Sequence, residues 1–210
     1  MTKPCIACRQ QLQGIVVVTN TSTLHPSKFH PAVWKFRSNT FTLDRSSDGH
    51  EPAGIFDPPQ FDFHFYTPGE AERMSISPYK VDSVKFKKLP ATARLPIVYF
   101  PTPGAIPQTG THCIDLTFPE TNGQLFTQTF IYGSFDGKVN FYQPGIKKIF
   151  LDSDATFKKA ILTPTKFQTA GYCPTKMKVT EAAGGTHMTL ENFMYRTQQG
   201  NQVCIFSFFE

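Results

Sequence analysis

A run of six residues, Phe61 to Tyr66, alternates so strictly that it constrains the fold more than any other part of the chain. Successive side chains of a β-strand point to opposite faces of a sheet. The phenylalanines at every second position are therefore expected to fill a core. Asp62, His64 and Tyr66 then line up about 7 Å apart on the other face. Such a row can form a polar site, or it can be the wet face of an ordinary strand.

The rest of the chain also favours strands. It holds 21 Phe against one Trp, and its 14 Gly and 17 Pro residues are spread between short apolar runs. Phenylalanine favours sheet faces, and glycine and proline mark the turns between short elements. We expect residues 1–210 to form a single domain of about ten short strands, an all-β sandwich or barrel with one or two short helices. The best helix candidates are one turn at residues 68–74 and the stretch 146–162.

One hairpin and one surface segment are marked by their turn residues. The runs Leu125 to Tyr132 and Lys138 to Tyr142 flank an Asp136-Gly137 pair. Asp-Gly between two β-rich runs is a strong hairpin signal, because the turn needs positive φ there. Residues 90–108 are rich in proline, which blocks pairing inside a sheet, so this segment is expected to lie on the surface.

Charge and hydropathy exclude several classes of partner. The net charge of +5 comes from 21 basic and 16 acidic residues, and the lysines fall in small groups at 85–88, 147–148 and 158–159. A nucleic-acid-binding protein usually has a denser basic stripe, so we expect no nucleic-acid partner. Nucleic-acid binding through the lysines at 85–88 and 147–148 stays an alternative, which a binding constant insensitive to salt would rule out. No run approaches the roughly 18 apolar residues of a membrane span. No secretory signal is visible, so we expect a cytoplasmic protein, unless a signal precedes the numbering.

The five cysteines do not form a disulfide framework, and reduced thiols are the expected state. Cys5 and Cys8 form a lone C-x-x-C motif with neither a second such motif nor suitably spaced histidines. The last expected strand, Gln202 to Phe209, carries aromatic residues on both faces. An exposed edge of that kind would aggregate, so we expect it to be covered by a helix or by another subunit, and we favour a homo-oligomer.

A second candidate for chemistry is the segment from Gly110 to Asp115. In a strand, His112 shares one face with Ile114, while Cys113 and Asp115 share the other. Adjacent strand residues point apart, so Cys113 and His112 cannot form a nucleophile–base pair with each other. If the strands of His64 and His112 are neighbours, two imidazoles together with Asp62 or Glu120 would suit zinc, iron or manganese.

Three stretches together resemble an uncharacterised, β-rich bacterial family that is classed as a domain of unknown function. They are residues 58–66, residues 107–115 with Phe118-Pro119-Glu120, and residues 126–139. The resemblance covers roughly residues 50–175. Family members often carry His where this chain has Gln60, and Trp where it has Cys113, so one candidate ligand is missing here. The resemblance implies a β-structured, oligomeric protein and no known activity. It adds interest to His64, His112 and Asp115, which lie in its motifs.

Two functional hypotheses follow. In the first, a non-enzymatic β-protein binds a small apolar or amphipathic ligand, or a protein partner, as a homo-oligomer. This hypothesis agrees with the lack of a complete set of catalytic residues in the sequence. In the second, a metal-dependent enzyme acts on a small molecule through a divalent transition metal. Its residues would be His64 and His112 as ligands, Asp62 or Asp115 to complete the shell, Glu120 as general base and Tyr66 as hydrogen-bond donor to the substrate.

Overall fold

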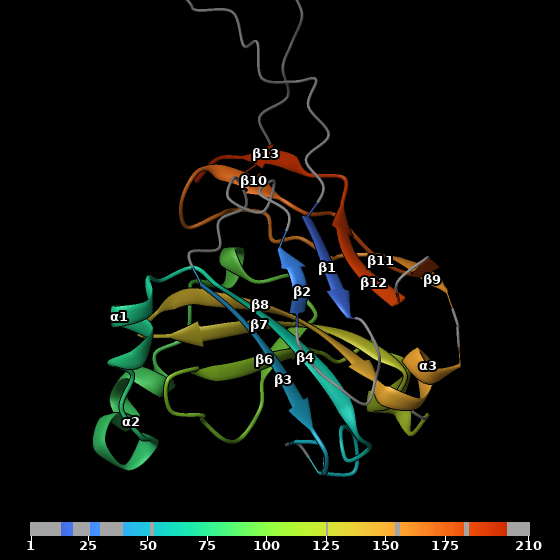
Figure 1. The fold of residues 1–210 in the computed structure, drawn as a ribbon. Helices are drawn as coiled ribbons and strands as arrows, with labels where there is room; N and C mark the ends of the chain where they lie inside the picture. Colours follow the sequence, from blue (N-terminus) through green and yellow to red (C-terminus); the bar gives the residue numbers. More distant parts are fainter. Residues whose placement is uncertain are drawn as a thin grey trace, which may run out of the picture.

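The computed structural model describes residues 14–18, 26–29, 40–50, 53–124, 126–153, 156–182 and 185–200. The strands among these residues form antiparallel sheets that pack as two main layers (Figure 1). One layer is a five-stranded sheet in the order β2-β1-β12-β11-β9. Its strands are β1 (Gly14–Val18), β2 (Pro26–Phe29), β9 (Phe157–Ala160), β11 (Lys176–Ala182) and β12 (Gly185–Glu191).

The other layer is a six-stranded sheet in the order β3-β4-β8-β7-β6-β5. Because β3 and β5 are its two edges, the described chain forms a sandwich of open sheets rather than a closed barrel. Its strands are β3 (Thr40–Ser46), β4 (Gln60–Tyr66), β5 (Tyr99–Pro101), β6 (Thr111–Asp115), β7 (Gln128–Phe135) and β8 (Lys138–Lys147). A small separate pair joins β10 (Gly171–Cys173) to β13 (Met194–Arg196).

The helices are few and short, but they differ from the expected ones. The described chain has α1 (Glu70–Met74), α2 (Tyr79–Lys87), α3 (Lys148–Asp152) and the 3-10 turns Thr92–Arg94 and Pro119–Asn122. The turn at 68–74 is confirmed as α1. In the stretch 146–162, a helix is confirmed at α3 but is wrong at Phe157–Ala160. That segment pairs with β11, because tertiary pairing overrides a weak local preference. The helix α2 was missed because it buries only Phe86 and so has no apolar stripe.

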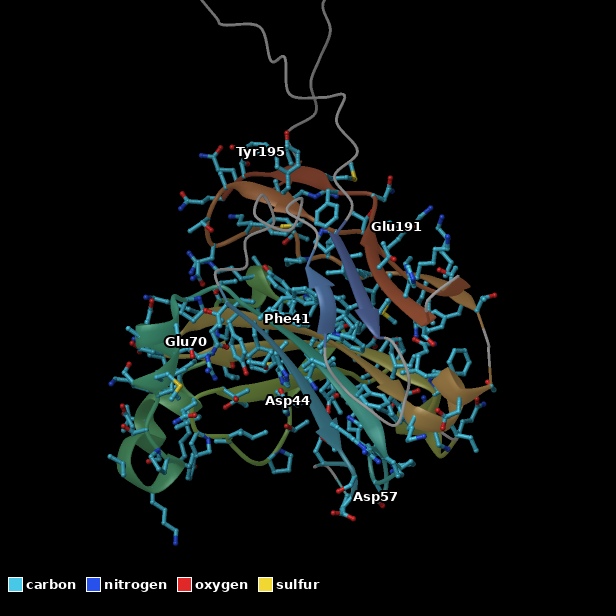
Figure 2. All side chains as sticks on the ribbon, in the orientation of Figure 1. Phe41, Asp44, Asp57, Glu70, Glu191 and Tyr195 are labelled. Atoms are coloured by element: carbon cyan, nitrogen blue, oxygen red, sulfur yellow. The ribbon has the colours of Figure 1, made fainter. Side chains whose placement is uncertain are left out.

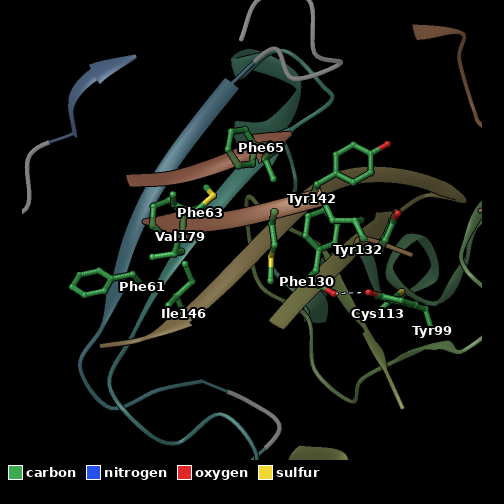
Figure 3. Packing of buried hydrophobic residues seen from close by; sticks show 14 of the residues in the cluster. Phe61, Phe63, Phe65, Tyr99, Cys113, Phe130, Tyr132, Tyr142, Ile146 and Val179 are labelled. Carbon is green, nitrogen blue, oxygen red and sulfur yellow. Dashed lines mark hydrogen bonds between the residues drawn. The ribbon is translucent and has the colours of Figure 1, made fainter. Parts of the chain in front are cut away.

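The alternation of β4 is confirmed. Phe61, Phe63 and Phe65 are at most 2% exposed and lie in the core between the two sheets, together with Met177 and Val179 of β11 (Figure 3). Burial of three large aromatic side chains stabilises the sandwich by roughly 1.5–3 kcal/mol each. This core fixes which face of β4 points toward the five-stranded sheet.

The opposite face of the six-stranded sheet is also buried. A second apolar cluster there includes Phe56, Ile131 and Phe141. Asp62 and Tyr66 are each 2% exposed and His64 is 7% exposed, so the polar row is not a wet face. By contrast, charged side chains such as Glu70 and Glu191 extend outward at the periphery (Figure 2).

The hairpin between β7 and β8 is confirmed by its turn. Asp136 and Gly137 have φ values of 47° and 74°, the positive values that a tight primed turn needs. Next to the turn the register shifts: Phe141 pairs with Gly133, but Val139 pairs with Ser134. Asn140 therefore has no partner across the hairpin, and its position is a β-bulge.

The proline-rich segment 90–108 holds the 3-10 turn Thr92–Arg94 and one strand, the short edge strand β5. Leu95 and Tyr99 are 9% and 6% exposed, so parts of the segment are buried. Several other expectations concern residues outside the described ranges, namely Cys5, Cys8 and the strand from Gln202 to Phe209. Within the described ranges, no helix has the length and apolar character required to cross a membrane.

Gly133 makes room for the ring of Phe141, which predicts a large effect of adding one methyl group. A Cβ at Gly133 would lie 1.8 Å from Cε1 of Phe141, far inside contact distance. We expect Gly133→Ala to lower the free energy of unfolding by about 2–3 kcal/mol, as overpacking does. Chemical denaturation measures this loss. A Cβ at Gly69 would meet no atom within 4 Å, so Gly69→Ala should change stability by less than about 1 kcal/mol. Equal effects of the two substitutions would contradict this account.

Candidate functional site

The candidate site lies on the face of the six-stranded sheet that points away from the five-stranded sheet. Antiparallel pairing aligns Tyr66, Phe141, Gly133 and His112 in one row across β4, β8, β7 and β6. Because Gly133 has no side chain, the ring of Phe141 occupies its place, and its centroid lies 5.4 Å from that of His112. Side chains from strands that are not neighbours can therefore approach one another here.

A second row aligns Asp44, Asp62, Gly145 and Thr129 across β3, β4, β8 and β7. A Cβ at Gly145 would lie 3.1 Å from Oδ1 of Asp62 and 3.0 Å from Cγ2 of Thr129. The glycine thus leaves the space that the Asp62 carboxylate occupies above β8.

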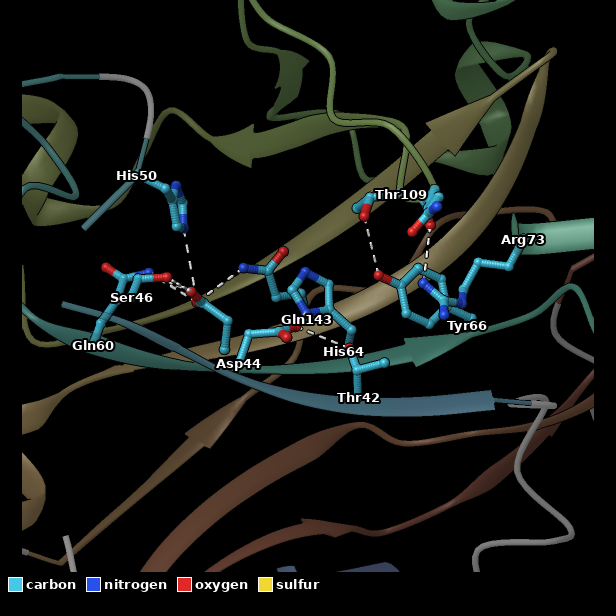
Figure 4. Close-up of polar contacts among 12 residues, drawn as sticks. Thr42, Asp44, Ser46, His50, Gln60, His64, Tyr66, Arg73, Thr109 and Gln143 are labelled. Carbon is cyan, nitrogen blue, oxygen red and sulfur yellow. Dashed lines mark hydrogen bonds and ion pairs between the residues drawn. The ribbon is translucent and has the colours of Figure 1, made fainter. Parts of the chain in front are cut away.

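Asp62 is the centre of a buried hydrogen-bond network (Figure 4). Nε2 of Gln60 donates to both carboxylate oxygens at 2.8 and 3.0 Å, and Nε2 of Gln143 donates to Oδ1 at 2.9 Å. Oγ of Ser46 donates to Oδ2 at 3.1 Å, and Nε2 of His50 lies 3.7 Å from Oδ1. The carboxylate therefore has donors from β3, β4 and β8, together with a nearby imidazole.

This network keeps Asp62 ionised. Burial by itself would raise the pKa of Asp62, but contact with His50, the charge of His64 and the hydrogen bond from Gln60 outweigh it and lower the pKa to about 2. The site therefore holds a fixed negative charge at physiological pH.

His64 is held by a second carboxylate. Its Nδ1 lies 2.9 Å from Oδ2 of Asp44, and this contact is the main reason that the pKa of Asp44 is lowered. The contact lies within hydrogen-bond distance, although the carboxylate is off the direction expected for a good hydrogen bond from Nδ1. Asp44 itself is half exposed at the edge strand, with 54% of its side chain accessible.

His112 approaches the other two imidazoles on the same face of the sheet, from the strand β6. Its ring centroid lies 5.3 Å from that of His50 and 6.4 Å from that of His64. Burial, followed by the charges of His50 and His64, lowers the pKa of His112 to about 3, so the ring is neutral at physiological pH. Gln143 lies close enough to oppose this shift, but no hydrogen bond of normal geometry reaches Nε2 of His112.

The other end of the site is closed by Tyr66 and Arg73. The Tyr66 hydroxyl lies 3.2 Å from Oγ1 of Thr109, and burial raises the pKa of Tyr66. The Arg73 guanidinium lies 5.0 Å from the centroid of the Tyr66 ring. Arg73 also donates to Glu70 within α1 and to the carbonyl of Gln108, so it connects α1 to the loop before β6.

A cavity of about 420 Å³ joins these groups. Four polar atoms on its wall are buried without a hydrogen bond of normal geometry. Nε2 of His50 and Nδ1 of His64 each lie near a carboxylate, which leaves Nε2 of His112 and Oε1 of Gln143. Such atoms are rare in folded proteins and mark sites where something else binds. The cavity-lining side chains with polar chemistry include Asp44, His50, Asp62, His64, Tyr66, Arg73, His112 and Gln143.

The cavity brings together four of the six residues expected to carry chemistry, namely Asp62, His64, Tyr66 and His112. The strands of His64 and His112 are not neighbours, because β8 and β7 lie between them. Both imidazoles pack against the ring of Phe141, whose centroid lies 5.4 Å from the centroid of each.

Asp115 and Glu120 lie elsewhere. Asp115 lies three residues after His112 on β6, so its side chain points to the opposite face of the sheet. Its Oδ1 accepts hydrogen bonds from the backbone N–H and the hydroxyl of Thr117 at 2.8 and 2.6 Å. Glu120 follows in a 3-10 turn beside Lys159, and burial raises its pKa. Neither carboxylate lines the cavity, so neither is placed to act on the histidines there.

The side chains also bear on metal binding. Among the residues that the structure describes, no group of three or more His, Cys, Asp and Glu side chains is arranged to hold a metal ion. Both carboxylate oxygens of Asp62 accept hydrogen bonds from protein groups, and Nδ1 of His64 faces Asp44. A metal ion bound at these atoms would have to displace those contacts.

Several residues of the cavity were not anticipated, and some of them had a signal. On β3, Thr42, Asp44 and Ser46 occupy every second position, with Leu43 and Arg45 between them, so they share one face as the polar row of β4 does. On β8, Gln143 lies two positions after Phe141, so period-two alternation would have found it. His50 and Arg73 lie outside strands and had no such signal.

Comparisons with models of known protein families, with curated proteins and with solved structures find no match to this chain. The resemblance based on the three motifs therefore stays a prediction, and the function must be inferred from the site itself.

Proposed function

We propose that this protein binds a small polar molecule in the cavity between His64 and His112. The observation that carries the proposal is the pair of buried, unpaired atoms on the cavity wall, Nε2 of His112 and Oε1 of Gln143. Leaving a buried polar atom unpaired costs about 1–3 kcal/mol, and a ligand that pairs with it recovers that cost. The volume of about 420 Å³ suits a small molecule.

The polar atoms restrict the chemistry of the ligand. Because Nε2 of Gln143 donates to Asp62, its Oε1 is left as an acceptor. The neutral imidazole of His112 can accept or donate. A ligand that satisfies both carries at least one N–H or O–H donor, and the carboxylates of Asp44 and Asp62 favour a neutral or cationic molecule over an anion. The expectation of an apolar ligand is therefore replaced, in this proposal, by a polar one.

The proposal retains self-association. Ile97, Phe100 and Leu116 are 93%, 50% and 47% exposed, and they lie at or beside the edge strand β5. Exposed apolar side chains next to an unpaired strand edge favour contact with another chain. A second copy that pairs along β5 would cover them.

The metal-dependent enzyme is the second candidate, favoured by the convergence of three imidazoles on one cavity. It receives less support because these groups are not arranged as metal ligands, and because Glu120, its expected general base, does not line the cavity. Elemental analysis of protein purified without a chelator tests it. A near-stoichiometric transition metal that is lost in both His64→Ala and His112→Ala would move this candidate to first place.

Native mass spectrometry of the untagged protein tests the leading proposal. We expect a multiple of the chain mass and a co-purifying small molecule, which denaturation releases for identification. Replacing His112 by alanine should weaken its binding about 3- to 10-fold, because Nε2 of His112 is one of the two atoms proposed to pair with the ligand. His187→Ala is the matched control, because His187 lies on β12 of the other sheet and does not line the cavity.

Failure can be recognised in two ways. If no molecule co-purifies, the protein is screened with small amines, amides and alcohols by thermal shift. The absence of any hit in that screen would count against the proposal. Equal losses in the two histidine variants would show that the cavity is not where the ligand binds.

A further inference from the structure

A second cavity, of about 540 Å³, lies on the other side of α1. It is bounded by residues 67–76, by the β7–β8 hairpin and by Gln168 and Thr169. The helix α1 separates the two cavities, because Arg73 lines the first and Glu72 lines the second. Nothing in the function proposed above uses this second cavity.

Its buried polar group is Asn140, the residue of the β-bulge. Asn140 is 5% exposed, and its Nδ2 donates to the carbonyl of Thr109 at 2.5 Å. Oδ1 is then the acceptor left over, and it has no hydrogen-bond partner. Bulges often occur next to binding sites, and Asn140 lines the second cavity.

The neighbouring backbone is adapted to this side chain. Gly110 has a φ of +125°, and a Cβ there would lie 2.7 Å from the carbonyl oxygen of Ser134 and 3.1 Å from Nδ2 of Asn140. Only glycine fits such a position without strain. The amide of Asn140 is therefore held in place from two sides, by Thr109 and by the close approach of Gly110.

Charges of both signs lie at the rim. Among the described residues, Glu72 and Lys138 line the cavity and take part in no ion pair, and both are exposed. The other two charged residues of the lining are already paired, Lys85 with Asp82 at 2.6 Å and Asp136 with Lys88 at 2.8 Å. One carboxylate and one ammonium are thus available to a ligand.

The walls between these charges are partly apolar. Ile76 and Val139 are 5% and 6% exposed, and the half-buried ring of Phe135 lies beside them in the lining. A ligand that fills the cavity would place an apolar group against these side chains, and the gain is about 25 cal/mol per Å² of apolar surface removed from water.

From these groups we infer that the second cavity binds a small amphipathic zwitterion, an α-amino acid with an apolar side chain. Its ammonium donates to Oδ1 of Asn140 and is attracted by Glu72. Its carboxylate is attracted by Lys138. Its side chain packs against Ile76 and Phe135. A molecule with only one of the two charges leaves one rim residue or the buried acceptor unused.

Isothermal titration calorimetry of the full chain with L-leucine tests this inference. The matched probes are 4-methylpentanoate, which lacks the ammonium, and 3-methylbutylamine, which lacks the carboxylate. We expect L-leucine to bind, and each probe to bind at least about 5-fold more weakly, because each forfeits roughly 1 kcal/mol of charge and hydrogen-bond interactions. Equal affinities for all three, or no binding of L-leucine, would overturn the inference.

Variants at the rim locate the site without disturbing the fold. Asn140 is unsuitable, because Thr109 joins it to Tyr66 in the first cavity. Lys138→Gln should weaken L-leucine binding about 2- to 5-fold, the range of an exposed ion pair. Lys80→Gln is the matched control, since Lys80 is exposed on α2 and does not line the cavity. Equal affinities of the two variants would overturn the assignment to this cavity.

Binding that survives His64→Ala would separate this inference from the function proposed for the first cavity.

Discussion

Replacing Asp62 by alanine should lower the free energy of unfolding by about 3–5 kcal/mol. The carboxylate accepts hydrogen bonds from Gln60, Gln143 and Ser46 and lies close to His50. Its removal leaves these buried donors without an acceptor, and each orphaned group costs about 1–3 kcal/mol. Urea denaturation followed by circular dichroism measures the loss.

Two further variants define the cause of this loss. Asp62→Asn keeps the shape and one acceptor oxygen, so it should cost less than alanine, about 1.5–3 kcal/mol. Asp48→Ala is the surface control, because Asp48 is exposed and contacts only Ser47 among the hydrogen bonds observed, and it should change stability by less than about 0.5 kcal/mol. If Asp62→Ala were as mild as Asp48→Ala, the network would not stabilise the fold.

The charge of Asp62 also has a pH signature. Its pKa in the folded protein is about 2, below the ordinary value of 3.8, so the unfolded chain binds more protons between these values. The stabilisation is complete above pH 3.8 and is lost as the pH falls toward 2. One pKa unit corresponds to about 1.4 kcal/mol, so roughly 2 kcal/mol is lost across this window.

Acid should weaken the protein well before Asp62 titrates, because of His112. Its pKa is about 3 in the folded protein against an ordinary 6.5, so below pH 6.5 the unfolded state binds the proton and the folded state does not. Stability that is complete above pH 6.5 therefore declines as the pH falls. Over two pH units, from 6.5 to about 4.5, this residue should account for about 2–3 kcal/mol.

His112→Gln isolates this contribution, since glutamine fills a similar space and does not titrate. We expect the free energy of unfolding of wild type, measured in urea at several pH values, to fall more steeply between pH 6.5 and about 4.5 than that of the variant. The histidines that do not interact with His112 contribute equally to both curves, and the coupling of His50 and His64 to His112 is part of the difference. Parallel curves would mean that His112 is protonated in the folded state.

The sequence determined which residues share a face of each strand. Strict alternation placed the phenylalanines of β4 in the core and Asp62, His64 and Tyr66 opposite them, and it separated His112 from Asp115 on β6. The Asp136-Gly137 turn was predictable for the same kind of reason, because positive φ is a local property of the residue. Each of these features depends only on neighbours along the chain.

Only the tertiary structure decided whether the polar row is wet or buried, and which residues meet it. The row is buried because a second apolar cluster covers that face, and its members come from distant parts of the chain, such as Phe56 and Phe126. His64 approaches His112 beside the ring of Phe141, for which Gly133 leaves space, although their strands are not neighbours.

The same limit explains the carboxylates that lie elsewhere. Asp115 and Glu120 follow His112 closely in sequence, yet alternation turns the first to the other face and a 3-10 turn carries the second to Lys159. Gln143, from a strand far along the chain, takes a place beside Asp62 instead. Side-chain alternation is local and can be read from the sequence. Strand order and register depend on the packing energy of the whole sheet, which is spread over many contacts and is not written in any one segment.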